Sequence, residues 1–256
     1  MSASALTAWP DPRWIAHRGA GKLAPENTLA AFRYGAAHGF RMFECDVKLS
    51  ADGVPFLMHD ATLERTTSGQ GTGGDLTWSA LSKLDAGSWH SRAFAGEPLP
   101  SFENIARFCL RNGYFLNIEI KPTPDTASAP GSERRTGEIV ALEAQRLWAG
   151  QAVPPLLSSF RPESLAGARD IAPQLPRALL LDTLRNGWLA EAQQLGCVAV
   201  VCNHALWDDA TVAQVHGAGM RALSYTVNDE WAAERLIALG TDGVITDRVD
   251  LFSPAG

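Results

Sequence analysis

Polar and charged side chains recur at every second position in two otherwise apolar stretches of the sequence. Glu44 and Asp46 lie in the first stretch, and Asn117, Glu119 and Lys121 alternate with isoleucines in the second. Alternate residues of a strand share one face, so two neighbouring strands would bring three carboxylates together. All-oxygen ligand sets suit a hard divalent cation, here Mg²⁺, Ca²⁺ or Mn²⁺. A lone Glu-x-Asp pair is more often ion-paired with arginine or lysine, and the repeat on a second strand is what favours a cation.

Two histidines, His17 and His59, each end a predicted strand. Imidazole titrates near neutral pH, so one ring can take a proton from an attacking oxygen while the other protonates a leaving oxygen. A single histidine at a strand end is more often a packed, hydrogen-bonded side chain. Their shared location beside the acidic cluster is what favours acid–base chemistry, and we assign no role to the other histidines.

Two cations, Arg18 and Lys121, accompany the acids and suit an anion that bridges to the metal, for which phosphate is the obvious candidate. The alternative is that each cation only neutralises Glu44 or Glu119. The sequence contains neither a nucleotide-binding Gly-x-x-x-x-Gly-Lys-Ser/Thr loop nor a Gly-x-Gly-x-x-Gly turn after the first strand. Residues 25–28, Pro-Glu-Asn-Thr, read as a helix cap, with Asn27 or Thr28 accepting backbone N–H groups.

Short apolar runs alternate with segments of helical period along nearly the whole chain, which is typical of a parallel α/β fold. The predicted strands are residues 14–17, 42–46, 114–120, 155–159, 177–181, 197–201, 221–226 and 243–246. The predicted helices between them include residues 26–38, 102–111, 137–148, 208–216 and 229–239. Eight strands with crossover helices in 256 residues match a single (β/α)8 TIM barrel. The chain after Asp247 is too short for an eighth helix.

A hairpin interrupts the alternation after the second strand. Asp52-Gly53 lies between two extended runs, and a two-residue turn there would pair Ala51 with Val54 and carry His59 opposite Asp46. Residues 61–100, rich in glycine, serine and threonine, then form an insertion within the barrel domain, which we interpret as a small cap or lid.

Composition narrows the class of protein. With 46% hydrophobic and 20% charged residues the chain can bury a full core, and its formal charge of −6 argues against nucleic-acid or anionic-membrane partners. The four cysteines show no CxxC spacing, so they read as reduced thiols. No signal peptide or membrane span is recognisable, and we expect a cytoplasmic monomer or homodimer.

The motifs together resemble the glycerophosphodiester phosphodiesterase family over nearly the whole chain. The matching segments are His17-Arg18-Gly19, Pro25-Glu26-Asn27-Thr28, Glu44-Cys45-Asp46, Asp52-Gly53-Val54-Pro55 leading to His59-Asp60, Asn117-Ile118-Glu119-Ile120-Lys121, Ser158-Ser159-Phe160, Tyr225-Thr226-Val227-Asn228 and residues 242–247. One departure is Tyr225, where members often carry tryptophan. Both rings are flat and amphipathic and could face a glycerol backbone.

The resemblance implies a TIM barrel with a small insertion and metal-dependent cleavage of glycerophosphodiesters to sn-glycerol 3-phosphate and an alcohol. It also implies the following roles: His17 and His59 as acid and base, Glu44, Asp46 and Glu119 as metal ligands, and Arg18, Lys121 and Tyr225 as substrate contacts. The first nucleophile could be water or the glycerol 2-hydroxyl, and the sequence does not say which histidine is the acid.

Three other functions fit parts of the pattern. A phosphatidylinositol-specific phospholipase C could use two histidines on a similar barrel, but the chain lacks an apolar or basic membrane-binding surface pattern. A sugar-phosphate isomerase or aldolase is compatible with the fold, and an aldolase would use Lys121 as a Schiff base. A barrel that only senses phosphodiesters would have no need of both histidines.

Overall fold

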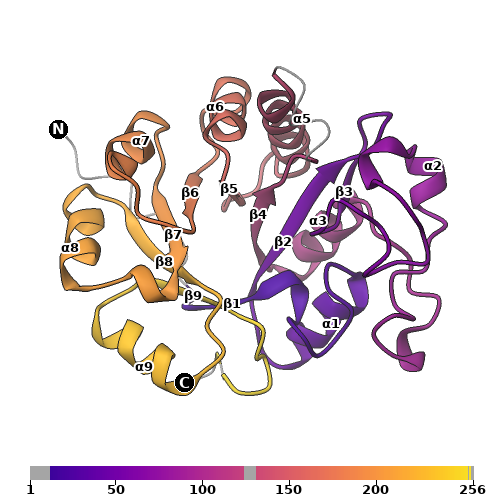
Figure 1. Ribbon diagram of the computed structural model, residues 1–256, viewed down its shortest axis with the longest axis horizontal. Coiled ribbons are helices and arrows are strands. Elements are labelled where there is room, and N and C mark those ends of the chain that lie inside the picture. The colour runs from indigo at the N-terminus through magenta and orange to yellow at the C-terminus, as the bar shows by residue number, and fades with distance from the viewer. Residues whose placement is uncertain (1–11, 124–130, 253, 255–256) are drawn as a thin grey trace.

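Eight short strands form a closed parallel barrel in the computed structural model, which describes residues 12–123, 131–252 and 254. The barrel strands are β1 (Trp14–Ala16), β2 (Met42–Leu49), β4 (Phe115–Ile120), β5 (Leu156–Ser159), β6 (Arg177–Leu181), β7 (Ala199–Asn203), β8 (Arg221–Tyr225) and β9 (Gly243–Thr246). β1 closes the ring because it pairs in parallel with both β2 and β9. The architecture confirms the predicted (β/α)8 barrel (Figure 1).

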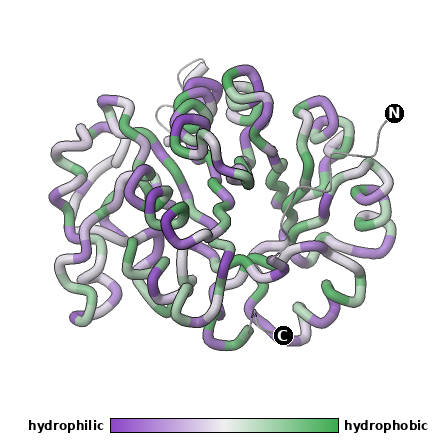
Figure 2. The backbone as a smooth tube through the Cα atoms, turned by 180° about the vertical axis from the view of Figure 1, so that it is seen from behind, coloured by the Kyte–Doolittle hydropathy of each residue, from purple (hydrophilic) through white to green (hydrophobic). Residues whose placement is uncertain are grey.

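Seven helices surround the strands as crossovers (Figure 1). They are α1 (Leu29–Ala37), α3 (Phe102–Asn112), α5 (Ser132–Leu147), α6 (Pro162–Ile171), α7 (Trp188–Gln194), α8 (Asp209–Gly217) and α9 (Glu230–Ala238). Hydrophobic and hydrophilic residues alternate every few positions along these helices, as expected where one face packs on a sheet (Figure 2). The sequence predicted that the chain after Asp247 is too short for a helix, and the described residues 248–252 contain a turn there. The Phe252 ring stacks on Trp14 with their centroids 4.5 Å apart.

The apolar core lies in two layers separated by the barrel wall. Outward-facing strand residues such as Cys45 and Ile118 pack with the helices in the larger cluster. A smaller cluster that includes Ile15, Met42 and Leu180 fills the barrel interior. This apolar plug leaves the carboxyl ends of the strands as the place where polar side chains converge.

The register of the hairpin after β2 differs from the one predicted for a two-residue turn at Asp52-Gly53. β3 (Pro55–Leu57) pairs antiparallel with β2 so that Lys48 lies opposite Phe56, and Ser50 N donates to Val54 O at 3.0 Å. Three residues, 51–53, therefore form the turn, and Gly53 supplies the left-handed residue with φ +79°. The extra turn residue places Met58, rather than His59, opposite Asp46, and Met58 N donates to Asp46 O at 3.0 Å.

The insertion at residues 61–100 folds beside β3, at the right of Figure 1. It contains the short helix α2 (Trp78–Leu81) and two 3₁₀ turns, η3 (Gly73–Asp75) and η4 (Arg92–Phe94). Its own apolar cluster joins Leu63, Leu81 and Ala86 to Phe56 and Met58 of the hairpin. Its action as a cap over bound substrate stays a prediction.

The structure also bears on the predictions about the cysteines and about membrane-spanning segments. All four cysteines are buried free thiols. Among the residues that the structure describes, no helix has both the length and the apolarity needed to cross a bilayer. The cytoplasmic location and the monomeric or dimeric state stay predictions.

Candidate active site

Three carboxylates from two adjacent strands converge at the carboxyl end of the barrel. Glu44 and Asp46 lie on β2, Glu119 lies on β4, and the parallel register puts Asp46 beside Glu119. One oxygen from each of the three lies within 4.8 Å of the others. The residues are only 3%, 1% and 9% exposed, respectively, so their mutual repulsion is weakly screened.

Burial and mutual repulsion oppose the ionisation of two of the three acids, although Arg18 and Lys121 form ion pairs within the cluster. Burial, with repulsion from Asp46 and Glu119, raises the pKa of Glu44 well above its usual value. Burial and Asp46 likewise raise the pKa of Glu119 to about 7. Glu44 Oε1 is buried and has no hydrogen-bond partner in the described part of the chain. An unpaired carboxylate oxygen beside two other acids fits a hard divalent cation, which would bind the ionised forms of all three.

Of the three acids, Asp46 has the most hydrogen-bond and ion-pair partners. Its side chain accepts a hydrogen bond from Asn27 Nδ2 at 2.8 Å and forms ion pairs with Lys121 Nζ at 3.2 Å and Arg18 Nε at 3.4 Å. Although burial opposes ionisation, Lys121 and Arg18 hold its pKa far below the usual range. Asp46 is therefore a fixed anion around which the other groups are arranged.

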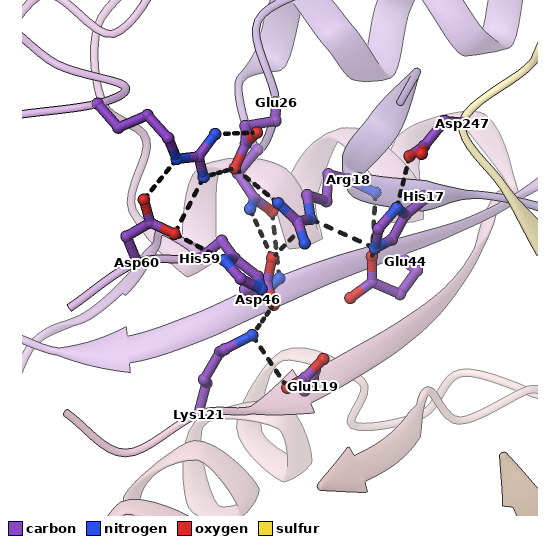
Figure 3. A network of polar contacts seen from close by, with 12 residues as sticks. His17, Arg18, Glu26, Glu44, Asp46, His59, Asp60, Glu119, Lys121 and Asp247 are labelled. Atoms are coloured by element: carbon purple, nitrogen blue, oxygen red, sulfur yellow. Dashed lines mark hydrogen bonds and ion pairs between the residues drawn. The ribbon is translucent and has the colours of Figure 1, made fainter. Parts of the chain in front are cut away.

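His17 follows β1 and has one carboxylate partner on each side (Figure 3). Its Nδ1 lies 2.6 Å from Asp247 Oδ1, and its Nε2 lies 3.8 Å from Glu44 Oε2. Despite burial, the hydrogen bond from His17 lowers the pKa of Asp247 to about 2. Ionised Asp247 can only accept, so His17 donates from Nδ1, and its Nε2 accepts a hydrogen bond from Arg18 Nε at 3.3 Å.

His59 follows the hairpin and has the same kind of partner. Its Nδ1 lies 2.8 Å from Asp60 Oδ1, and Arg65 of the insertion binds the same carboxylate. The hydrogen bond from Arg65 is the main cause that lowers the pKa of Asp60, so Asp60 too is an acceptor. Burial, together with the charges of Lys121 and Arg18, lowers the pKa of His59 and favours its neutral ring.

Arg18 joins the loop after β1 to the acidic cluster. Its backbone N–H donates to Glu44 Oε2 at 3.0 Å, and its side chain donates to Glu26 Oε1 at 2.9 Å. Arg65 contacts the same Glu26 carboxylate, so an alternating chain of charges runs from the insertion to Asp46 (Figure 3). Burial opposes the charge of Arg18, but Asp46, Glu26 and Glu44 raise its pKa, so it stays a cation.

A cavity of about 180 Å³ brings most of the predicted site residues together. Its lining comprises His17, Arg18, Glu44, His59, Asn117, Glu119, Lys121, Ser158, Phe160, Leu180, Tyr225, Thr226 and Ile245. Tyr225 and Phe160 meet edge to face in its wall with their ring centroids 5.7 Å apart. The Tyr225 hydroxyl donates to Leu181 O at 3.0 Å, which fixes the ring and leaves its face as the surface available to a ligand.

Comparison with known proteins identifies the family. The sequence model of the glycerophosphoryl diester phosphodiesterase family matches residues 17–251, from the first histidine to five residues before the end of the chain. The chain belongs to this family. Membership makes the protein a phosphoric diester hydrolase, as the motifs predicted.

Relatives of this family align over most of the chain. A glycerophosphodiester phosphodiesterase of Caldanaerobacter subterraneus is 33% identical, with 91% of this chain and 93% of the relative covered. One from Bacillus subtilis is 31% identical, with 93% and 84% covered. Among solved structures, an Oleispira antarctica phosphodiesterase in complex with the product sn-glycerol 3-phosphate is 32% identical, has a TM-score of 0.84, and has 93% of both chains covered.

For two site residues of this phosphodiesterase, Asp247 and Asp60, the sequence predicted no role, and Asn27 was predicted only as an alternative to Thr28 for the helix cap. Asp247 pairs with His17 across 230 positions, and Asp60 pairs with its own neighbour His59. Asn27 is not the helix cap, because Thr28 accepts from Ala31 N, and Asn27 instead binds both the side chain and the backbone of Asp46. The sequence feature that could have indicated their roles is their location after predicted barrel strands or the hairpin, because functional groups gather at those places in a TIM barrel.

Proposed function

We propose that the protein hydrolyses glycerophosphodiesters to sn-glycerol 3-phosphate and an alcohol. In this proposal Glu44, Asp46 and Glu119 hold one divalent cation, which is Mg²⁺, Ca²⁺ or Mn²⁺. The observation that carries the proposal is the three-carboxylate cluster with its unpaired Glu44 oxygen, two members of which, Glu44 and Glu119, line one cavity with both histidines. The product bound to the Oleispira relative supports the choice of substrate.

The cation supplies positive charge to the phosphate oxygens and lowers the pKa of an oxygen nucleophile. The chain itself adds two cations at the same place. Lys121 Nζ uses two contacts on Asp46 and Glu119, at 3.2 and 3.3 Å, which leaves one of its three N–H bonds for a phosphate oxygen. Arg18 lines the same cavity and binds the phosphate from the side of β1.

The two histidines move the protons. Both rings donate from Nδ1 to a carboxylate, so Nε2 is the atom of each ring that exchanges a proton with substrate. At His17 the substrate takes the place of the hydrogen bond that Arg18 Nε donates to Nε2. One ring takes the proton of the nucleophile, and the other returns a proton to the departing alkoxide. The edge-to-face pair of Tyr225 and Phe160 lies against the glycerol backbone and fixes its orientation.

The test is the release of sn-glycerol 3-phosphate from a panel of soluble glycerophosphodiesters by the purified protein. We expect release that stops when EDTA removes divalent ions and returns when Mg²⁺, Ca²⁺ or Mn²⁺ is added back. Activity that survives chelation contradicts the role of the metal. Release of free glycerol together with a phosphorylated alcohol contradicts the proposed cleavage, and detection of a cyclic glycerol phosphate by ³¹P NMR would identify the 2-hydroxyl as the first nucleophile.

A further inference from the structure

A second, larger cavity of about 660 Å³ adjoins the first one. The two cavities share His59, Glu119, Lys121, Phe160 and Leu180 in their linings, so a molecule bound at the acidic cluster can extend from one into the other. Of the two rings assigned to the glycerol backbone, Tyr225 lines only the smaller cavity, and Phe160 lines both. The larger cavity is therefore the place where the alcohol portion of the diester lies.

Lys48 lines the larger cavity and forms no ion pair within the part of the chain that the structure describes. It lies on β2 two residues after Asp46, on the same face, and is only 2% exposed. Its Nζ donates to Lys121 O at 3.5 Å, and the structure, over the ranges that it describes, records no ion pair for it. A buried ammonium with one long hydrogen bond is costly unless an anion satisfies it.

The other cations around the larger cavity are already paired. Lys121 contacts two carboxylates, Arg161 lies 3.5 Å from Glu133, and Arg185 contacts Glu191. Each of these cations thus has a carboxylate partner, whereas Lys48 is buried without an ion pair to any described residue.

The acids around the larger cavity do not pair with Lys48. Asp60 binds Arg65, and Glu119 binds Lys121. Asp182 is exposed and accepts a hydrogen bond from Thr183. Asp46, Glu119 and Asp60 attract the Lys48 ammonium without forming an ion pair with it, so its remaining N–H bonds are available to an anion bound in the cavity.

We propose that Lys48 binds a negatively charged group on the alcohol portion of the diester, so that the protein favours glycerophosphodiesters whose alcohol carries a carboxylate or a second phosphate. Two residues of strand span about 6.6 Å, which sets the scale of the separation between the phosphate held near Asp46 and the anion held by Lys48. A carboxylate or phosphate two or three carbons from the ester oxygen lies at a comparable distance. This proposal depends on the phosphodiesterase function proposed above.

The experiment compares substrates that differ by one anionic group. Glycerophosphoserine is glycerophosphoethanolamine with an added carboxylate, and glycerophosphoglycerol phosphate is glycerophosphoglycerol with an added phosphate. We expect kcat/KM to be higher for the anionic member of at least one pair. In Lys48→Gln that preference should fall about tenfold or more, since hydrogen bonds to charged groups are strong in buried sites. The pair that responds shows whether carboxylate or phosphate is the favoured anion.

Two further variants control for the substitution itself. Lys48→Arg keeps the charge and should retain most of the preference. Lys83→Gln removes an exposed lysine of the insertion and should leave the preference unchanged. If Lys48 only offsets the acidic cluster, Lys48→Gln lowers kcat/KM for both members of each pair by the same factor, and the proposal is wrong.

A binding measurement separates this proposal from the phosphodiesterase function. Titration calorimetry with phosphoserine and phosphoethanolamine should give tighter binding of phosphoserine to the wild-type protein, with the difference lost in Lys48→Gln. If neither diester pair is hydrolysed but this difference is found, the proposed activity fails and the anion subsite stands. Equal affinities in the wild-type protein, or an unchanged difference in the variant, overturn the subsite.

Discussion

Each histidine of the site forms a hydrogen bond through Nδ1 to a carboxylate, which orients its ring. Asp247 and Asp60 both have lowered pKa values, so they stay ionised and fix the proton of each ring on Nδ1. His17 and His59 were predictable from the sequence because each ends a predicted strand beside the same acidic cluster. The role of Asp247 was not predictable, because nothing in the sequence around residue 247 indicates that it pairs with His17.

Replacing either histidine tests its role in proton transfer. His17→Ala and His59→Ala should each lower kcat by about 10²-fold or more, the usual contribution of acid–base catalysis. Calorimetric titration should still detect cation binding in both variants, since neither residue belongs to the carboxylate cluster. His38→Ala, at an exposed position on the far end of α1, is the control. Near-normal turnover in one of the two site variants removes that residue from the chemistry.

Asp247→Asn tests whether the carboxylate orients His17. An amide can donate to Nδ1 and favour the wrong tautomer, so kcat should fall about 10²-fold while KM changes less. Asp250→Asn changes an exposed aspartate that pairs with Arg248 and is the matched control. Equal effects of the two substitutions would contradict a specific role for Asp247.

The same carboxylate gives a pH dependence to stability. Its pKa falls from 3.8 in the unfolded chain to about 2 in the native protein, so ionised Asp247 stabilises the fold above about pH 4. This contribution is lost as the pH falls from about 4 to about 2. Urea unfolding at several pH values should show the stability difference between wild type and Asp247→Asn to be largest above pH 4 and to shrink below it. A difference that grows in acid would contradict this linkage.

At the scale of elements, the loop between β1 and α1 positions the acidic side chains of the site through Arg18 and Asn27. The sequence predicted a helix from residue 26, whereas α1 begins at Leu29, because Asn27 adopts φ +59° and directs its side chain to Asp46. The strands and their faces were predictable because alternation is a local signal. The start of α1 was not predictable, because Asp46, which binds the Asn27 side chain, lies on a strand distant in the sequence. The turn at residues 51–53 differed by one residue because Asp-Gly fits turns of two and of three residues.

Two substitutions of Asn27 separate its hydrogen bonds from its backbone conformation. Asn27→Gly accepts positive φ freely but loses both bonds to Asp46, and Asn27→Ala loses the bonds and adds strain. Both should weaken cation binding by about 10- to 100-fold, as loss of groups that orient metal ligands usually does. Denaturant unfolding should find the alanine variant less stable than the glycine variant by about 1 kcal/mol. Unchanged cation affinity in the glycine variant would show that Asn27 does not position Asp46.

At the scale of the whole molecule, the fold was the most predictable feature. Eight strands and their crossover helices need only local patterns, and the ring closes through β1 with β2 and β9. The alternating charges that join Arg65 of the insertion to Glu26 and Arg18 were not predictable, since they depend on how the insertion lies against the barrel.

Because the acidic cluster joins β2 to β4, cation binding should stabilise the whole barrel. At about 100 times the dissociation constant, a ligand adds about 2.7 kcal/mol, which corresponds to a rise in Tm of about 5–10 °C for a protein of this size. Thermal unfolding in EDTA and in added cation measures the shift. Glu119→Gln should lose most of it. An equal shift in that variant would mean that the cation stabilises the protein from another place.

The most direct test of the site is a crystal structure of the protein with Mn²⁺ and sn-glycerol 3-phosphate, in which anomalous scattering locates the ion. We predict one ion bound by Glu44, Asp46 and Glu119, in contact with the phosphate, with Nε2 of His17 and of His59 facing that phosphate. An ion bound elsewhere, or histidine rings too far from the phosphate to exchange a proton with it, would contradict the proposed chemistry.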